Sequence, residues 1–218
     1  MKMVLGRVCV FCGSSTGIRP DYRAAAEELA REMAARGIGL VFGGGCVGLM
    51  GHLADAVLAT GGHAIGVIPD ALVAREIAHR GLPDLRVVHS MHERKVGSLL
   101  RPDKTALVWR SAPRTAVMAD LSDAFVALPG GFGTFEELCE AITWTQLGLH
   151  RKRCGLLNVA GFYDPLLSLF DGAVRTGFIR DASREIVYAT ADARDLLDRL
   201  ALPLALPEPT WLRSTGQT

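Results

Sequence analysis

The residues of this chain whose types and spacing best suggest chemistry lie at positions 123–137, in the segment DAFVALPGGFGTFEE. An apolar stretch runs into Pro129 and a glycine-rich segment, and then a helix-like stretch begins with Glu136 and Glu137. Glycines allow consecutive backbone N–H groups to turn toward one point, and the start of a helix adds the positive end of its dipole. The segment therefore predicts an anion cradle with a carboxylate beside it, as in an enzyme that acts on a phosphorylated small molecule.

The same residues allow a second interpretation. Thr134 and Glu137 have the spacing of a capping box, in which Thr caps a helix N-terminus and Glu reaches back to the capping residue. From the residues alone, both the capping box and the functional carboxylate stay open.

Two other turns come directly after predicted strands. Ser14 follows the first strand, where it either binds a ligand or caps the next helix. After the second strand, Gly43, Gly45 and Gly48 match the spacing of a dinucleotide fingerprint, but the acidic residue expected at the end of the following strand is missing. We therefore interpret the turn around Gly44 as the lining of a nucleotide pocket or as a tight strand-to-helix joint.

Strand-like and helix-like stretches alternate along the chain, which is typical of an α/β fold. The predicted strands lie at 7–11, 39–42, 63–68, 85–88, 124–128, 154–158 and 185–188. The main predicted helices lie at 21–36, up to about 60, and at 134–147, 164–175 and 191–200. We expect a single Rossmann-like domain over residues 1–200, with a doubly wound parallel sheet of about six or seven strands and helices on both faces. Residues 201–218 are predicted to form an extended C-terminal tail.

Composition narrows the classes of function. The 218 residues are 49% hydrophobic, which suits one folded domain, and the net charge of +1 gives no reason to expect nucleic-acid or membrane binding. No stretch has the roughly 18 uncharged apolar residues of a membrane span, and the N-terminus is not a convincing signal peptide. The five cysteines suit a reducing compartment, so we expect a cytoplasmic protein. Cys9 and Cys12 should point to opposite faces of a strand, which favours buried thiols over a metal site.

Three segments together resemble one enzyme family: FGGGCVGLMG at 42–51, MHERK at 91–95 and PGGFGTFEE at 129–137. They resemble the cytokinin-activating phosphoribohydrolases, the lonely-guy family, whose members have often been labelled lysine decarboxylases. CGSS at 12–15, REIAH at 75–79 and TWTQLGLH at 143–150 add to the resemblance, which extends from about residue 7 to residue 200. It implies a Rossmann-like homodimer, with the active site near the interface. It also implies hydrolysis of N6-substituted adenosine 5′-monophosphates to the free base and ribose 5-phosphate.

The resemblance also assigns roles by position. It places the catalytic residues at Arg94 and Glu137, and in that context we interpret Glu137 as catalytic rather than as part of a cap. The expected substrate-binding residues are those that match the family's nucleotide contacts and those of the three turns, namely Glu76, Lys95, Gly130, Gly131, Phe132, Gly133, Thr134, Glu136, Thr143, Ser14 and Gly44.

These residue types suit the reaction. Cleavage of an N-glycosidic bond passes through a ribosyl cation, which a carboxylate stabilises directly or quenches by activating water. Arginine offers a bidentate fork to phosphate or to the base. We expect no metal and no organic cofactor. The decarboxylase label finds no support in the residues, since none of the four lysines lies in a setting that suggests a pyridoxal phosphate Schiff base.

One departure from the family pattern comes after MHERK. About 20 additional residues, 96–115, precede the family-like segment MADLSDAF, and Pro102 and Pro113 prevent a simple extension of the helix. This insert is an outward loop, a lid or an artefact of the gene sequence. It also leaves a second arginine for the catalytic position, because Arg114 has the family spacing when counted back from Met118. We favour Arg94, since its neighbours match the motif.

Two other functions stay open: an AMP or nucleotide nucleosidase of broader range, and a non-catalytic nucleotide-cofactor carrier similar to the molybdenum cofactor carrier proteins. A carrier needs the cradle but not the pair of Arg94 and Glu137. The helix after the cradle is apolar nearly all round, with Trp144 and Leu147 three residues apart. This pattern favours burial against another element or another subunit, which independently supports a dimer.

Overall fold

The parallel sheet expected from the sequence is present. The computed structural model describes residues 2–73, 77–88 and 117–206. Within these residues seven strands form one sheet in the order β4-β3-β2-β1-β5-β6-β7, and all their pairings are parallel. The strand order reverses at β1, which lies between β2 and β5. Ligands of doubly wound sheets bind at such a switch point, beyond the carboxyl ends of the strands. The prediction of a doubly wound, Rossmann-like fold is confirmed.

The strands are β1 (Arg7–Phe11), β2 (Gly39–Phe42), β3 (Ala64–Pro69), β4 (Asp84–Val88), β5 (Ala124–Ala127), β6 (Cys154–Leu157) and β7 (Val187–Thr190). The helices are α1 (Pro20–Ala35), α2 (Gly48–Ala59), α3 (Asp70–Val73), α5 (Val117–Asp120), α6 (Phe132–Gln146), the 3-10 turn η1 (Val159–Gly161), α7 (Asp164–Arg175), α8 (Asp181–Arg184) and α9 (Ala193–Leu200).

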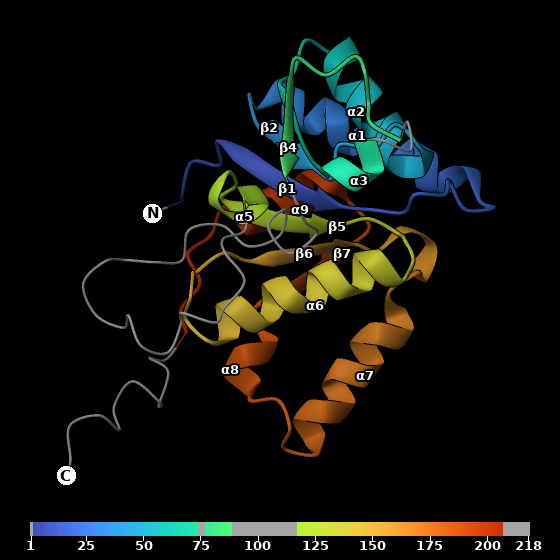
Figure 1. Cartoon of the computed structure of the whole chain (residues 1–218). Coiled ribbons are helices and arrows are strands. Elements are labelled where there is room, and N and C mark those ends of the chain that lie inside the picture. The colour runs from blue at the N-terminus through green and yellow to red at the C-terminus, as the bar shows by residue number, and fades with distance from the viewer. Residues whose placement is uncertain (1, 74–76, 89–116, 207–218) are drawn as a thin grey trace.

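Two hydrophobic cores lie on opposite faces of the sheet, because alternate residues of a strand point in opposite directions. In β1, Val8 and Val10 belong to the core covered by α1, α2 and α9, whereas Cys9 and Phe11 belong to the core covered by α5, α6 and α7. Figure 1 shows the two layers, with α1 and α2 on one side of the sheet and α6 and α7 on the other. Cys12 joins the first core, so Cys9 and Cys12 do face opposite sides, and both are buried.

The predicted strands at 7–11 and 39–42 and the predicted helix at 164–175 are confirmed to the residue. The last predicted strand, at 185–188, is wrong by two residues: β7 is Val187–Thr190, because Glu185 caps the short helix α8. The last helix begins at Ala193 rather than 191, because the Asp192 side chain accepts a hydrogen bond from the backbone nitrogen of Asp195 (2.9 Å).

Among the described residues, no helix is both long and apolar enough to cross a bilayer. The insert predicted at 96–115 lies outside the described residues, as does residue 207 onward of the predicted tail. The division into one domain, an insert and a tail therefore stays a prediction.

Candidate functional site

The turns after β1, β2 and β5 are tied into one unit at the carboxyl edge of the sheet. The backbone nitrogen of Gly13 donates to the Pro129 carbonyl (3.1 Å), and the backbone nitrogen of Leu49 donates to the Gly13 carbonyl (3.1 Å). Gly13 thus joins the turn before α6 to the first turn of α2. The glycine-rich segment thus lies at the carboxyl edge of the sheet, where ligands of doubly wound sheets bind.

Two glycines of this unit leave no space for a side chain. A Cβ atom at Gly48, where φ is +60°, would lie 2.2 Å from the Ser14 carbonyl carbon. A Cβ atom at Gly130 would lie 2.2 Å from Oγ1 of Thr134 and 2.8 Å from the backbone nitrogen of Gly13. The close approach of the three turns therefore depends on glycine at both positions.

The first turn of α6 is open in contrast. Outside its chain neighbours and the backbone of α6, a Cβ atom at Gly131 or at Gly133 would meet none of the described residues within 4 Å, and Gly131, Phe132 and Gly133 are exposed. Gly131 is the N-cap of α6, with no side-chain hydrogen bond to this cap in the described structure. The first backbone N–H groups of a helix have no intrahelical partner, and the helix dipole adds positive charge there. These backbone groups can therefore receive an anion such as a phosphate.

The capping box allowed by the sequence is absent. Because α6 begins at Phe132, Thr134 is the third helical residue rather than the N-cap, and its side chain is buried against Gly130. The Thr134–Glu137 spacing is consequently not a cap. Glu137 lies one turn farther along the helix, as the catalytic interpretation requires.

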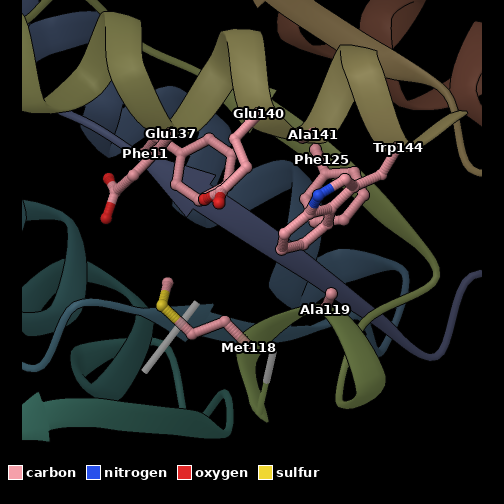
Figure 2. Close-up of a pocket in the computed structure, with 8 residues that line it drawn as sticks. All are labelled: Phe11, Met118, Ala119, Phe125, Glu137, Glu140, Ala141 and Trp144. Carbon is pink, nitrogen blue, oxygen red and sulfur yellow. The ribbon is translucent and has the colours of Figure 1, made fainter. Parts of the chain in front are cut away.

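Glu137 lies at one end of a small pocket beneath α6. The helix contributes Glu137, Glu140, Ala141 and Trp144, which share one helical face because they are three or four residues apart. Figure 2 shows these side chains above Phe11 and Phe125 of the sheet, with Met118 and Ala119 of α5 opposite. Glu137 and Trp144 mark the two ends in this view. The pocket therefore has a carboxylate at the end nearer the α6 N-terminus and aromatic walls farther along.

Two buried groups support the end of the site that holds Glu137. The Tyr163 hydroxyl donates to the Leu128 carbonyl (2.7 Å) and so fixes the chain just before Pro129. Burial, and secondarily the nearby Glu137 carboxylate, raise the pKa of the Cys12 thiol, which therefore stays protonated near neutral pH. Sequence reasoning missed the proximity of Cys12 to Glu137, because these residues lie far apart in the chain.

Other predicted residues are placed differently. Ser14 is exposed after β1 and does not cap α1, whose N-cap is Arg19. Glu136 and Thr143 are exposed on a face of α6 that lies about 100° from Glu137. Thr143 Oγ1 donates to the Cys139 carbonyl (2.7 Å). The structure does not bring Glu136 and Thr143 into the pocket with Glu137, and their contact with a nucleotide stays a prediction.

Gly44 is buried rather than exposed to a ligand. Its φ is +72°, and its carbonyl accepts a hydrogen bond from the backbone nitrogen of His79 (2.8 Å). The structure thus supports the interpretation of this turn as a tight joint, while its contact with substrate stays a prediction. Glu76, Arg94, Lys95 and the alternative Arg114 lie outside the described residues.

No group of three or more His, Cys, Asp or Glu side chains in the described part of the chain is arranged to hold a metal ion. The exposed backbone groups of α6 and the carboxylate of Glu137 are thus the chemical groups that the described turns bring together.

Comparison with known proteins identifies the family. The chain is 48% identical over 194 residues to the cytokinin riboside 5′-monophosphate phosphoribohydrolase LOG of Oryza sativa subsp. japonica, covering 89% of this chain and 72% of that protein. The chain belongs to this phosphoribohydrolase family. A second relative in it, the cytokinin riboside 5′-monophosphate phosphoribohydrolase LOG1 of Arabidopsis thaliana, is 47% identical over 194 residues, covering 89% of this chain and 82% of its own.

Two family descriptions match separate halves of this phosphoribohydrolase-family chain. The SLOG cluster4 family matches residues 7–98, and the family described as possible lysine decarboxylase matches residues 101–200. The boundary between the two matches falls within the predicted insert at 96–115.

Solved structures share the fold at low sequence identity. The molybdenum cofactor carrier protein of Chlamydomonas reinhardtii has a TM-score of 0.57 and 20% identity, covering 92% of this chain and 98% of that one. The molybdenum cofactor binding protein of Rippkaea orientalis has a TM-score of 0.60 and 19% identity, covering 91% and 94%. At this identity the likeness shows the fold alone.

Proposed function

We propose that the protein hydrolyses the N-glycosidic bond of cytokinin riboside 5′-monophosphates, which are N6-substituted adenosine 5′-monophosphates, to the free base and ribose 5-phosphate. The observation that carries the proposal is the position of Glu137 one turn beyond the open N-terminus of α6. The high identity to cytokinin riboside 5′-monophosphate phosphoribohydrolases supports the same substrate class.

The geometry suggests how the substrate lies. The 5′-phosphate accepts hydrogen bonds from the first backbone N–H groups of α6, where Gly131 and Gly133 leave space for it. The ribose then extends along the helix toward Glu137, so that the anomeric carbon lies near this carboxylate. Phosphate binding supplies much of the affinity and sets the position of the scissile bond.

The chemical step depends on this placement. The bond between the anomeric carbon and the base nitrogen breaks with its electron pair passing to the base, which takes up a proton. The Glu137 carboxylate stabilises the developing ribosyl cation and accepts a proton from the water whose oxygen bonds to the anomeric carbon. By resemblance, Arg94 is the second catalytic residue, with Arg114 as the alternative, and Glu76 and Lys95 contact the nucleotide. These roles are tested by substitution of each residue.

A substrate panel tests the proposed function. Isopentenyladenosine 5′-monophosphate, AMP and isopentenyladenosine are each incubated with the protein, and release of free base is monitored by chromatography. We expect rapid release from the first compound and little from the riboside, which lacks the phosphate. Equal rates for the nucleotide and its riboside would refute binding through the phosphate.

The same panel separates the alternatives. Release of adenine from AMP as fast as release of the prenylated base would indicate a nucleosidase of broader range. Tight binding of nucleotides without release of base would indicate a carrier. The likeness to molybdenum cofactor carrier proteins concerns the fold and does not favour that alternative over hydrolysis.

We also propose that the protein is a cytoplasmic homodimer with the active site near the interface. Large apolar side chains are exposed on α6, on α7 and after α7: Phe132 (92% exposed), Leu169 (65%) and Phe178 (88%). Burial of these side chains against a second copy would remove apolar surface from water. Light scattering on the intact protein and on the variant Phe178→Asp tests this, with a monomeric wild type as the contradicting result. Cell fractionation tests the compartment.

A further inference from the structure

A contact between an imidazole and a carboxylate, on the far side of the β2 turn, connects helix α2 to the segment at 77–82. Nε2 of His79 lies 3.0 Å from Oδ1 of Asp55. The His79 side chain is 10% exposed, whereas the Asp55 side chain is 70% exposed. A buried ring on one element is thus held by a carboxylate at the surface of another.

The segment that carries His79 is also bonded to the turn after β2. The backbone nitrogen of His79 donates to the Gly44 carbonyl (2.8 Å), and the backbone nitrogen of Cys46 donates to the Ile77 carbonyl (2.9 Å). Gly45 and Ala78 form an antiparallel bridge between these bonds. His79 therefore contacts the turn through its backbone and α2 through its ring.

The environment of the ring fixes its proton. Nδ1 of His79 is buried and has no hydrogen-bond partner among the described residues, so a proton at Nδ1 would be an unsatisfied buried donor. A proton on Nε2 donates to the Asp55 carboxylate instead. Asp55 is consequently the residue that orients the imidazole.

The turn held in this way belongs to the tied unit at the carboxyl edge. It continues through Gly48, which packs on the backbone of Ser14, and through Leu49, whose nitrogen donates to Gly13. The backbone of Gly13 in turn packs against Gly130, which directly precedes the open cradle. The Gly44–Cys46 backbone is therefore connected to the cradle through packed backbone atoms.

We propose that Asp55 and His79 are a pair of positioning residues, which hold the segment 77–82 on the Gly44–Cys46 turn and so set the affinity of the site for its nucleotide. The proposal rests on the proposed function and gives a role to Asp55 and to His79. The resemblance had assigned a role to neither, although His79 ends the REIAH segment. Glu76, which the resemblance assigns to nucleotide binding, directly precedes Ile77 in the chain. The pair touches neither substrate nor reacting atoms, so it acts on binding rather than on the bond-breaking step.

The pair is better suited to positioning than to global stability. A side-chain contact whose carboxylate is mostly exposed contributes little to the free energy of unfolding. Its effect on the position of the short segment 77–82 is larger. Two backbone hydrogen bonds, from His79 and Cys46, hold this segment on the turn, and the His79 ring connects the segment to α2.

The test compares Asp55→Ala with the conservative Asp55→Asn, whose amide oxygen can still accept from Nε2–H. Asp171→Ala is the matched control, because it likewise removes one exposed carboxylate from a side-chain contact. Asp171 lies on α7, and its Oδ1 lies 2.7 Å from Nε of Arg184. Three quantities are measured on each full-length protein: amide hydrogen exchange of residues 44–46 and 77–79, the steady-state constants for isopentenyladenosine 5′-monophosphate, and the thermal midpoint.

For Asp55→Ala we expect exchange at Cys46 and His79 to accelerate, and KM to rise, about tenfold each, with kcat changed by less than about twofold. Asp55→Asn should keep exchange and KM close to the wild-type values. Asp171→Ala should change neither quantity. Unchanged exchange would show that Asp55 and His79 do not hold the segment 77–82 on the turn. Faster exchange with unchanged KM, or a fall in kcat that tracks a lowered thermal midpoint, would overturn its role in binding.

The exchange measurement does not depend on catalysis. If the wild type releases no base, the proposed function fails, and calorimetric binding of AMP replaces KM in the comparison. A tenfold weaker binding in Asp55→Ala would still support the pair, and unchanged binding would refute it.

Discussion

The turns after β2 and after β5 are both rich in glycine, yet their glycines serve different purposes. At the β2 turn, Gly44 is buried beneath the His79 backbone and Gly48 packs on Ser14 with no space for a side chain. At the β5 turn, no atom of the described residues lies against Gly131 or Gly133 at the start of α6, apart from their chain neighbours and the helix backbone. The first turn is closed by neighbouring backbone, and the second is accessible to a ligand.

The difference arises from the chain segments that lie next to each turn. The segment 77–82 crosses the β2 turn and bonds to it, whereas α6 begins directly after Gly131 and leaves its first N–H groups uncovered by the described residues. Glycine spacing therefore predicts a tight turn, but the neighbouring chain decides whether the turn binds a ligand or packs against backbone.

The largest effect is expected at the open turn. Glu137→Gln should lower kcat by about a thousandfold, because it removes the charge that stabilises the ribosyl cation and the base that activates water. Free base release from isopentenyladenosine 5′-monophosphate measures this loss. Glu28→Gln, an exposed carboxylate on α1, is the control. A loss of less than about tenfold would contradict the catalytic role of Glu137.

The next effect separates the two turns by stability. Gly48→Ala should lower the free energy of unfolding by about 3 kcal/mol or more, since its Cβ would overlap the Ser14 backbone at a positive φ. Gly133→Ala should instead raise it by up to about 1 kcal/mol, because alanine favours a helix and its Cβ meets no described residue outside its chain neighbours and the helix backbone. Urea unfolding monitored by circular dichroism measures both. Equal effects would remove the distinction between a closed and an open turn.

A smaller effect concerns His150, which follows the C-terminal end of α6 and lies beside the buried Thr145. Burial, and secondarily Lys152, lower the pKa of His150 to about 3. An unfolded chain would protonate His150 near its ordinary pKa of about 6.5. The stability that the uncharged ring supports is therefore complete above pH ~6.5 and falls by up to about 1.4 kcal/mol per pH unit as the pH drops toward 3.

Urea midpoints measured between pH 7 and pH 4.5 test this dependence. Thr145 Oγ1 lies 3.2 Å from Nδ1 of His150. Glutamine at position 150 can keep a hydrogen-bonding group near Thr145 but does not titrate. His150→Gln should flatten the dependence on pH. The same slope in the wild type and the variant would show that His150 is not the group responsible.

Much of the fold was predictable because its signals are local. The apolar runs at Arg7–Phe11 and Gly39–Phe42 have polar or glycine-rich ends, and these strands were placed to the residue. The start of α6 was misplaced because Thr134 has the sequence preference of an N-cap, whereas packing on Gly130 buries it inside the helix. Tertiary contact there overrides local preference.

The candidate site was predictable only in part. The cradle and Glu137 lie within one continuous motif, so the sequence brought them together. The support from Cys12, Tyr163 and the Asp55–His79 pair depends on contacts between residues distant in the chain, for which a single sequence holds no signal. Glu136 and Thr143 were predicted to bind substrate because they belong to the family-like segments. In the structure they lie on a different face of α6 from Glu137.

The most direct test of the central claim, that the open start of α6 binds the 5′-phosphate, places a charge at Gly133. Aspartate fits there because, beyond its chain neighbours and the helix backbone, a Cβ meets none of the described residues within 4 Å, and at the start of a helix aspartate favours folding. Gly133→Asn is the uncharged match of similar shape. If the phosphate binds there, Gly133→Asp raises KM for isopentenyladenosine 5′-monophosphate about a hundredfold through repulsion of the phosphate, with a thermal midpoint at least equal to that of Gly133→Asn. Equal KM values for the two variants would contradict the central claim.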